Sequence, residues 1–286
     1  MPHHALIALL ALVACGASGS NTVQLEQAWR LDGFAAPESV ALSQDGTFLY
    51  VSNVNGEGDA HDGNGFISRV SLRGEILQRE FAAGLDAPKG LMQGGDALYV
   101  SDIDRLAVLD AATGAVRRTI AIEGADFLND LAFAPSGEVL IADSGTARIY
   151  AVDGQDRVSI WAENTLLSAI NGLFAEPDRL IVSTMQGRLL AIDYETRAIG
   201  VLAEGLGDGD GIAPLGGEHY LVSAWPGEMF VVNAADGTSQ RIMDTRAEPR
   251  YLNDILRVGD TLYVPHWQPG ELTAYRIADR ASSDAH

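Results

Sequence analysis

The sequence predicts an all-β protein, a six-bladed β-propeller whose four-stranded blades are closed into a ring by an N-terminal strand. A short motif containing one polar residue recurs six times, at steps of roughly 40 residues. An apolar run follows each copy, and Gly, Asp, Asn or Pro turns bound these runs, as expected of short strands. Because no segment shows sustained helical periodicity, the repeats favour a propeller over a helical array.

The motif brings its polar residue to the start of the strand that should be innermost in each blade. The first step is longer than the others because it contains a polar insert, residues 55–65. The aligned polar residues are Glu38, Lys89, Asn129, Asn171, Asp210 and Asn253. The apolar runs, expected to be second strands, are Leu49 to Ser52, Leu98 to Ser101, Leu140 to Asp143, Leu180 to Ser183, Tyr220 to Ser223 and Leu262 to Pro265.

The sixth repeat contains only three predicted strands and ends near Ile277. The segment Val23 to Trp29, from the other end of the chain, is expected to supply its outer strand and so to join the termini. No interdomain linker is apparent. We therefore predict one propeller domain over residues 21–280, followed by a disordered tail, residues 281–286.

The N-terminus predicts export. An apolar run from Ala5 to Ala14 is too short to span a bilayer and is typical of a signal-peptide core. The segment Leu12 to Cys15 resembles a lipoprotein lipobox, which implies cleavage before Cys15, acylation of its thiol and a tether ending near residue 20. An ordinary secretory signal is the alternative. Since Cys15 is the only cysteine, no internal disulfide is expected.

The charge excludes one class of partner. With 39 acidic and 19 basic residues, the formal net charge is −20, which argues against nucleic acid because its binding depends on Lys and Arg. We predict a monomer that binds a small-molecule substrate, contacts the membrane only through a lipid on Cys15, and lies on the periplasmic face of the envelope or is secreted.

The aligned polar residues form a candidate metal site. Inner strands line the channel of a propeller, so residues that open them should converge near one face. Carboxylate and amide oxygens are hard ligands that suit Ca²⁺ or Mg²⁺. Alternatively, Asn and Asp only cap strand ends and satisfy turn hydrogen bonds.

Four copies of the motif resemble those of the senescence marker protein/gluconolactonase family, six-bladed propellers that include regucalcin and have paraoxonases and diisopropyl fluorophosphatase as distant relatives. The similarity covers almost all of Glu26 to Ile277. Its motifs are Pro37-Glu38-Ser39-Val40, Leu128-Asn129-Asp130-Leu131, Ile170-Asn171-Gly172-Leu173 and Gly209-Asp210-Gly211-Ile212. The resemblance implies a divalent cation, Ca²⁺ first and Mg²⁺, Mn²⁺ or Zn²⁺ as alternatives, held by Glu38, Asn129, Asn171 and Asp210.

The resemblance further implies a hydrolase of lactones or related esters, in which the cation polarises the carbonyl. Asp210 is expected to act as a ligand first and as base or nucleophile second. Lys89 cannot bind a cation, so it should pair with Glu38 or Asp210 or contact a substrate carboxylate. His266 is a candidate acid, base or substrate contact, with a structural role as its alternative.

Pocket walls are expected from the ends of the second strands, namely Asn53, Asp102, Asp143, Thr184, Trp225, His266 and Trp267. The insert, residues 55–65, should lie on the same face as a mobile polar loop, with a lid or a second cation loop as alternatives. A non-catalytic propeller that binds a ligand or a partner around a structural metal remains the second reading, because this fold hosts both kinds of function.

Overall fold

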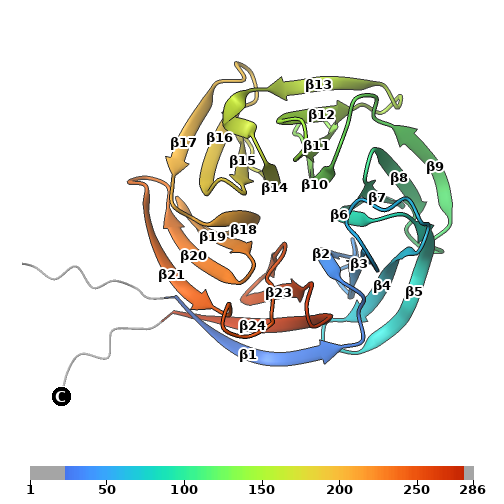
Figure 1. Cartoon of the computed structure of the whole chain (residues 1–286), viewed down its shortest axis with the longest axis horizontal. Coiled ribbons are helices and arrows are strands. Elements are labelled where there is room, and N and C mark those ends of the chain that lie inside the picture. Colours follow the sequence, from blue (N-terminus) through green and yellow to red (C-terminus); the bar gives the residue numbers. More distant parts are fainter. Residues whose placement is uncertain (1–22, 280–286) are drawn as a thin grey trace, which may run out of the picture.

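The protein, described here as a computed structural model over residues 23–279, is an all-β ring of six four-stranded sheets. Figure 1 shows the sheets arranged radially around a central opening, with one strand of each sheet facing that opening. One short 3₁₀ helix, Thr165–Leu167, precedes the fourth blade. The predicted fold class is therefore confirmed. No helix among residues 23–279 has the length and apolarity needed to cross a membrane.

In the first five blades the four strands follow one another along the chain from the centre outwards, whereas the outermost strand of the sixth comes from the N-terminal end. The innermost strands are β2 (Pro37–Leu42), β6 (Pro88–Gly94), β10 (Leu128–Phe133), β14 (Ile170–Ala175), β18 (Asp208–Gly216) and β22 (Leu256–Val258). The second strands are β3 (Phe48–Asn53), β7 (Ala97–Asp102), β11 (Val139–Asp143), β15 (Arg179–Thr184), β19 (His219–Trp225) and β23 (Thr261–His266).

The two outer layers complete the blades. The third strands are β4 (Gly65–Ser71), β8 (Arg105–Asp110), β12 (Arg148–Val152), β16 (Arg188–Asp193), β20 (Glu228–Asn233) and β24 (Glu271–Asp279). The outermost strands are β5 (Ile76–Leu85), β9 (Val116–Ala121), β13 (Val158–Glu163), β17 (Ile199–Ala203), β21 (Thr238–Asp244) and β1 (Val23–Asp32).

The ring closes where β1 pairs with β24 in antiparallel register, from Val23 opposite Asp279 to Asp32 opposite Glu271. These two strands lie side by side at the edge of the ring in Figure 1. Trp29 secures the junction, since its indole nitrogen donates to the carbonyl of Leu72 at 3.1 Å. The predicted closing strand is thus present, and it extends three residues beyond Trp29. The proposed signal peptide, Cys15 and the C-terminal tail lie outside the described residues.

The core lies between neighbouring blades. One cluster joins Leu140 and Trp161 of the third blade to Leu180 and Leu190 of the fourth. Because the second strands are covered on both faces by adjacent blades, they carry continuous apolar runs; all five residues of β11 are buried. Burying each such large side chain contributes roughly 1.5–3 kcal/mol.

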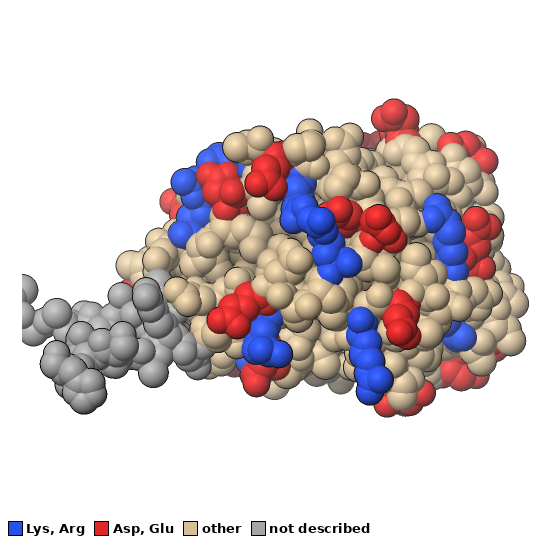
Figure 2. Space-filling view, turned by 90° about the horizontal axis from the view of Figure 1, so that it is seen from below, with Lys and Arg blue, Asp and Glu red and all other residues tan. Residues whose placement is uncertain are grey.

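The outer surface carries both signs of charge in alternation. Figure 2 shows basic and acidic side chains intermixed over the visible face. Arg117, for example, pairs with Asp96 at 2.9 Å and with Asp110 at 2.6 Å. Local ion pairs therefore engage some of the acidic side chains, and at exposed positions such pairs contribute little stability.

Candidate functional site

Five inner strands contain the same irregularity near their start. In β10, Leu128 pairs with Asp143 and Leu131 pairs with Ile141, so β10 holds one residue more than β11 over this step. Equivalent register shifts occur in β2, β6, β14 and β18. A β-bulge re-aims side chains and increases the local twist. In each of these blades the aligned polar residue of the motif lies inside the bulge.

Serines on the second strands stabilise the bulges. Ser183 accepts the backbone N–H of Gly172 at 2.9 Å, and Ser223 accepts that of Gly211 at 2.8 Å. The same hydroxyls donate to carbonyls of the next blade, Ser183 to Asp210 and Ser223 to Asn253. Each serine thus satisfies a backbone group left unpaired by its bulge and links two blades.

Two aspartates perform a related task in the third and sixth blades. Asp130 accepts the backbone N–H of Leu131 and that of Leu173 in the next blade, both at 2.7 Å. Asp254 accepts the N–H of Ile255 at 2.7 Å and the hydroxyl of Ser39 at 2.5 Å. These aspartates and serines were not predicted as part of the site, although Ser recurs visibly at the end of the apolar runs.

The six aligned polar residues line a single cavity of about 280 Å³. Each is between 2% and 5% exposed, so all of them are buried. The structure therefore brings together every predicted cation ligand and Lys89. The members of this group, called the polar ring below, are Glu38, Lys89, Asn129, Asn171, Asp210 and Asn253.

The polar ring contains oxygen atoms without partners. The Oε2 atom of Glu38 and the Oδ1 atoms of Asn129, Asn171 and Asn253 are buried and accept no hydrogen bond from the described residues. Buried acceptors are normally satisfied, and each exception requires a cause. Strand capping does not supply one, because these oxygens bind no backbone N–H. Such a set fits a hard cation, with Asp210 as a further oxygen ligand.

Carboxylates crowd this region. Burial raises the pKa of Glu38 well above its usual range, and the charges of Asp210 and Asp254 raise it further, whereas Lys89 lowers it. The pKa of Asp210 is likewise raised well above its usual range by burial, then by Asp254 and Asp130. Burial raises the pKa of Asp254 to about 6. A bound cation would offset this repulsion.

Acidic side chains alone do not form a cation site in this region. Among residues 23–279, no group of three or more His, Cys, Asp and Glu side chains is arranged to hold a metal ion. Two carboxylates would therefore depend on asparagine amide oxygens to complete a cation site. Such a mixed oxygen set is acceptable to Ca²⁺ and less suited to transition metals.

Lys89 is buried without a carboxylate partner among the described residues. Its Nζ donates to the carbonyls of Gly58 at 2.7 Å and Ala87 at 3.3 Å, and it lies 4.0 Å from the centre of the Phe127 ring. Burial lowers the pKa of Lys89 to about 8, although the charges of Glu38, Asp102 and Asp59 act in the opposite direction. The expected direct pairing with Glu38 or Asp210 is not seen, because backbone carbonyls hold the ammonium group.

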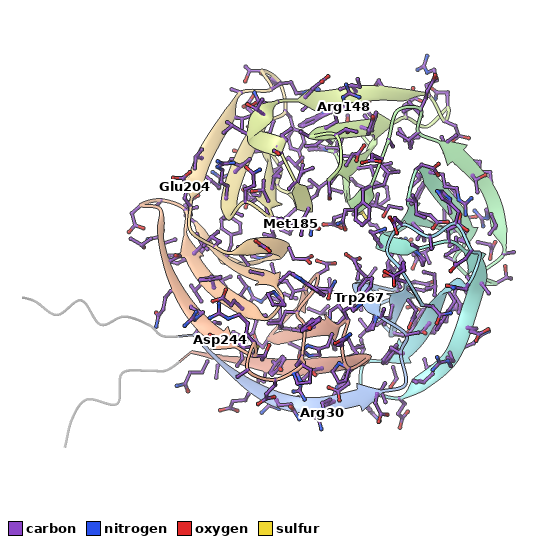
Figure 3. The ribbon with its side chains drawn as sticks, in the orientation of Figure 1. Arg30, Arg148, Met185, Glu204, Asp244 and Trp267 are labelled. Carbon is purple, nitrogen blue, oxygen red and sulfur yellow. The ribbon has the colours of Figure 1, made fainter. Side chains whose placement is uncertain are left out.

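Large apolar side chains form the rest of the cavity wall. Figure 3 shows Met185 and Trp267 beside the central opening, whereas the other labelled residues lie towards the perimeter. The apolar wall, as we call it below, consists of Phe127, Met185, Trp225 and Trp267. Trp225 and Trp267 were predicted; Phe127 and Met185 were not, although each directly adjoins a predicted strand end.

The remaining wall predictions are wrong. Asn53, Asp102, Asp143 and Thr184 are fully buried and do not line the cavity. Asp102 accepts the backbone N–H groups of Asp86 and Ala87, and Asp143 those of Asp126 and Phe127. These side chains turn inwards because they brace the segments leading into the inner strands.

His266 also lies away from the cavity lining. It is fully buried, with Nδ1 3.2 Å from the carbonyl of Tyr251 and Nε2 3.0 Å from the hydroxyl of Thr273. Burial lowers the pKa of His266 to about 4. Because both ring nitrogens have protein partners, the structure corresponds to the structural alternative rather than to contact with a substrate.

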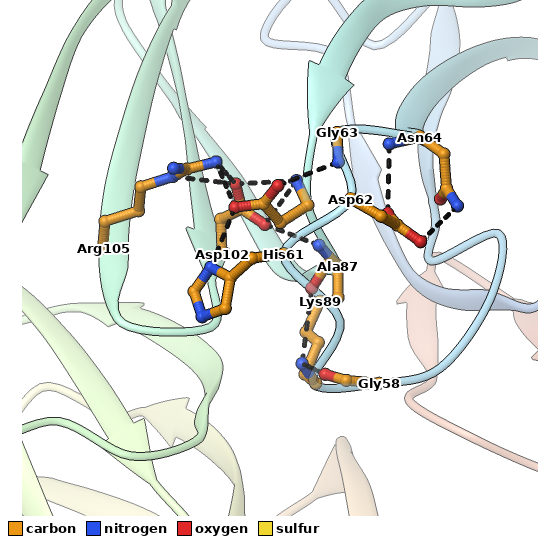
Figure 4. Close-up of polar contacts among 10 residues, drawn as sticks. Gly58, His61, Asp62, Gly63, Asn64, Ala87, Lys89, Asp102 and Arg105 are labelled. Carbon is orange, nitrogen blue, oxygen red and sulfur yellow. Dashed lines mark hydrogen bonds and ion pairs between the residues drawn. The ribbon is translucent and has the colours of Figure 1, made fainter.

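The insert, residues 55–65, forms part of the cavity rim and is tied to the second blade (Figure 4). His61 Nδ1 lies 3.1 Å from Asp86, and the N–H of Gly63 donates to Asp86 at 2.9 Å. Asp86 in turn pairs with Arg105 at 2.9 Å. Gly58 of the insert lines the cavity, and its carbonyl accepts a hydrogen bond from Lys89. The insert was expected to be a mobile polar loop, but these contacts hold it against the second blade.

The fold and site define a six-bladed β-propeller with a polar ring and an apolar wall in one central cavity. No family model and no curated protein matches the sequence. Among solved structures, virginiamycin B lyase from Staphylococcus aureus has a TM-score of 0.65 at 11% identity, covering 90% of this chain and 100% of that chain.

Two further structures show the same similarity. A streptogramin B lyase has a TM-score of 0.64 at 11% identity, covering 90% of this chain and 98% of that chain. A nidogen/laminin complex has a TM-score of 0.62 at 17% identity, covering 74% and 86%. At these identities the likeness establishes the propeller fold and does not establish the resemblance to the gluconolactonase family.

Proposed function

We propose that this propeller is a divalent-cation-dependent hydrolase of lactones or related esters. The observation that carries the proposal is the set of unpartnered buried oxygens on Glu38, Asn129 and Asn171, together with the Asp210 carboxylate, in one cavity. These four residues would hold the cation, with Ca²⁺ as the first candidate. When bound, it would supply polarisation of the substrate carbonyl and stabilisation of the developing oxyanion.

Asp210 would act primarily as a ligand of the cation. A carboxylate that binds a cation keeps a low pKa, so it becomes a competent base only if it disengages during turnover. Water adds to the carbonyl carbon and the ring C–O bond breaks, which yields a hydroxy acid without any further reactant. Direct attack by the Asp210 carboxylate, followed by hydrolysis of the acyl-aspartate, is the alternative route.

Lys89 would assist the leaving oxygen. Its ammonium group borders the cavity, and within residues 23–279 its partners are two neutral carbonyls and an aromatic face. A proton donor with a pKa of about 8 can protonate a departing alkoxide near neutral pH. His266, with both nitrogens engaged, would act on the site only by holding Tyr251.

The test is hydrolysis of a panel of small lactones and aryl esters by the wild type and by Asp210→Asn, after chelation and after Ca²⁺ is restored. Asp208→Asn is the matched control, because Asp208 is exposed on the same strand. The proposal expects turnover that requires the cation, is lost in Asp210→Asn and is retained in Asp208→Asn. Calcium binding without any turnover would favour a non-catalytic propeller with a structural ion.

The cellular setting is proposed on the N-terminal sequence alone. Export, acylation of Cys15 and attachment to the periplasmic face of the envelope would bring the site into contact with small molecules entering the cell. Radiolabelled palmitate incorporation that is lost in Cys15→Ser would support this setting, and a chain released without lipid would favour ordinary secretion.

A further inference from the structure

The apolar wall is partly exposed. Met185 is 37% exposed, and Phe127, Trp225 and Trp267 are partly exposed, although all four lie around one cavity. Removing such side chains from water is favourable in proportion to the apolar area that is buried. The cavity therefore offers apolar surface that the chain itself leaves uncovered.

The wall is preorganised. Trp225 packs against Tyr251 with ring centres 4.6 Å apart and lies nearly perpendicular to Trp267 at 6.3 Å. Tyr251 is fixed in turn, because its N–H donates to the carbonyl of Gln268 at 2.9 Å and its carbonyl contacts His266. A ligand group that enters here meets rings that are already held in place, which reduces the entropic cost of binding.

The wall and the polar ring line the same cavity. A molecule whose reacting carbonyl reaches the polar ring must therefore place its remaining atoms near Phe127, Met185, Trp225 and Trp267. A volume of about 280 Å³ is near the lower end for ligand pockets, so the molecule is small.

We infer that the substrate class is a lactone or ester carrying a compact apolar substituent, such as a phenyl ring or a short alkyl chain, rather than a polyhydroxylated sugar lactone. The choice of a lactone or ester as the reacting group rests on the proposed function. The choice of an apolar substituent rests on the apolar wall. Hydroxyl groups facing the wall would lose their hydrogen bonds to water without replacement. A phenyl ring would instead contact aromatic edges and faces.

The test uses γ-lactams, which share the lactone shape and resist hydrolysis. One probe carries a phenyl substituent and the other carries two hydroxyl groups, and dissociation constants are measured by calorimetry in calcium-containing buffer. The expected result is at least about tenfold tighter binding of the phenyl lactam, equivalent to about 1.4 kcal/mol. Equal or tighter binding of the dihydroxy lactam would overturn the inference.

Variants of the wall residues test whether the apolar wall causes the preference for the phenyl lactam. Trp267→Ala should weaken the phenyl lactam about tenfold and the dihydroxy lactam less than twofold. Met185→Asn, at a position that is 37% exposed, should weaken the phenyl lactam severalfold. Ile160→Ala, on the outer strand β13 and 50% exposed, should change neither. An unaltered preference in both wall variants would contradict the inference.

The outcome is separable from that of the lactonase assay. If lactones are not hydrolysed but the phenyl preference is found and depends on the wall, the proposed reaction fails and the apolar subsite stands. If lactones are hydrolysed without any preference for apolar substituents, the reaction stands and this inference fails.

Discussion

The hydroxyl of Ser183 donates to the backbone carbonyl of Asp210 in the next blade while it accepts the N–H of Gly172 in its own blade. One side chain therefore ties a bulge in the fourth blade to the polar-ring position of the fifth. Ser223 repeats the arrangement one blade further on, between Gly211 and Asn253. The polar ring is thus held by links between blades as well as by the strands that carry it.

Ser183→Ala should destabilise the protein. The substitution leaves two buried backbone groups without their partner, which costs about 1–3 kcal/mol for each group that water cannot reach. Urea denaturation measures this loss, with the exposed Ser159→Ala as control. An unchanged free energy of unfolding in Ser183→Ala would show that the hydroxyl does not link the blades.

Gly172→Ala should be more damaging. A Cβ atom at this position would lie 2.1 Å from the carbonyl oxygen of Asp210, whereas one at Gly200 would meet nothing within 4 Å. Because backbone must move to relieve the clash, we expect a loss of about 3 kcal/mol or more, or no soluble protein. Gly200→Ala should fold normally, and a normal melting temperature for Gly172→Ala would refute the close approach of the two bulges.

Glu38→Gln should separate stability from cation binding. It removes one of several buried carboxylates that raise one another's pKa, so the cation-free protein should gain on the order of 1 kcal/mol. The proposed site also requires Ca²⁺ to raise the melting temperature of the wild type, and this rise should be lost in Glu38→Gln. Differential scanning fluorimetry with chelator or Ca²⁺ measures both effects, with exposed Glu80→Gln as control. A full calcium response in Glu38→Gln would exclude Glu38 as a ligand.

Lys89 should impose an upper limit on the pH range of activity. If its ammonium group protonates the leaving oxygen, kcat/KM should fall as the pH rises through about 8, the pKa of Lys89. Lys89→Met should lower kcat and remove this basic limb while it preserves calcium binding. A basic limb that persists in Lys89→Met would assign the titration to another group.

Protonation of His266 should lower the stability of the protein at acidic pH. The pKa of His266 in the folded protein, about 4, lies below the ordinary histidine value of 6.5, so the neutral form is favoured in the fold. Its contribution is complete above pH 6.5 and is lost as the pH falls towards 4, by up to about 3 kcal/mol. His266→Gln should be less stable at pH 7 and should lose less stability on acidification. Parallel unfolding curves for the two proteins against pH would contradict this assignment.

The repeat spacing and the register of one polar residue per copy were enough to predict the blades, their closure by Val23 to Trp29 and the convergence of Glu38, Asn129, Asn171 and Asp210. These features follow from periodicity, which a single sequence displays directly. The bulges were not predictable in this way, because one extra residue on an inner strand leaves no distinct composition. The sequence therefore predicted which polar residues lie near the start of five inner strands, but not how they are aimed. In the sixth blade Asn253 precedes the inner strand, which begins at Leu256.

Several residues that were predicted to line the cavity do not, because the scaffold uses their side chains. Asp102 and Asp143 pair with Pro88 and Leu128, the register position that Ala224 takes opposite Gly209, so Trp225 lies one residue beyond it. The two aspartates are drawn inwards because neighbouring backbone N–H groups require acceptors. His266 is also engaged by the scaffold, through the carbonyl of Tyr251 and the hydroxyl of Thr273. Which polar side chain is used by the scaffold depends on backbone groups distant in sequence, and a strand pattern does not reveal it.

The central claim is that the polar ring binds a divalent cation through Glu38, Asn129, Asn171 and Asp210. Its most direct test is a calorimetric titration of Ca²⁺ into chelator-treated wild type and into Asn171→Leu, which removes the unpartnered oxygen at nearly constant volume. We predict one site per chain in the wild type and at least about tenfold weaker binding in the variant. Absence of calcium and magnesium binding by the folded wild type, or equal affinity in the variant, would contradict the account.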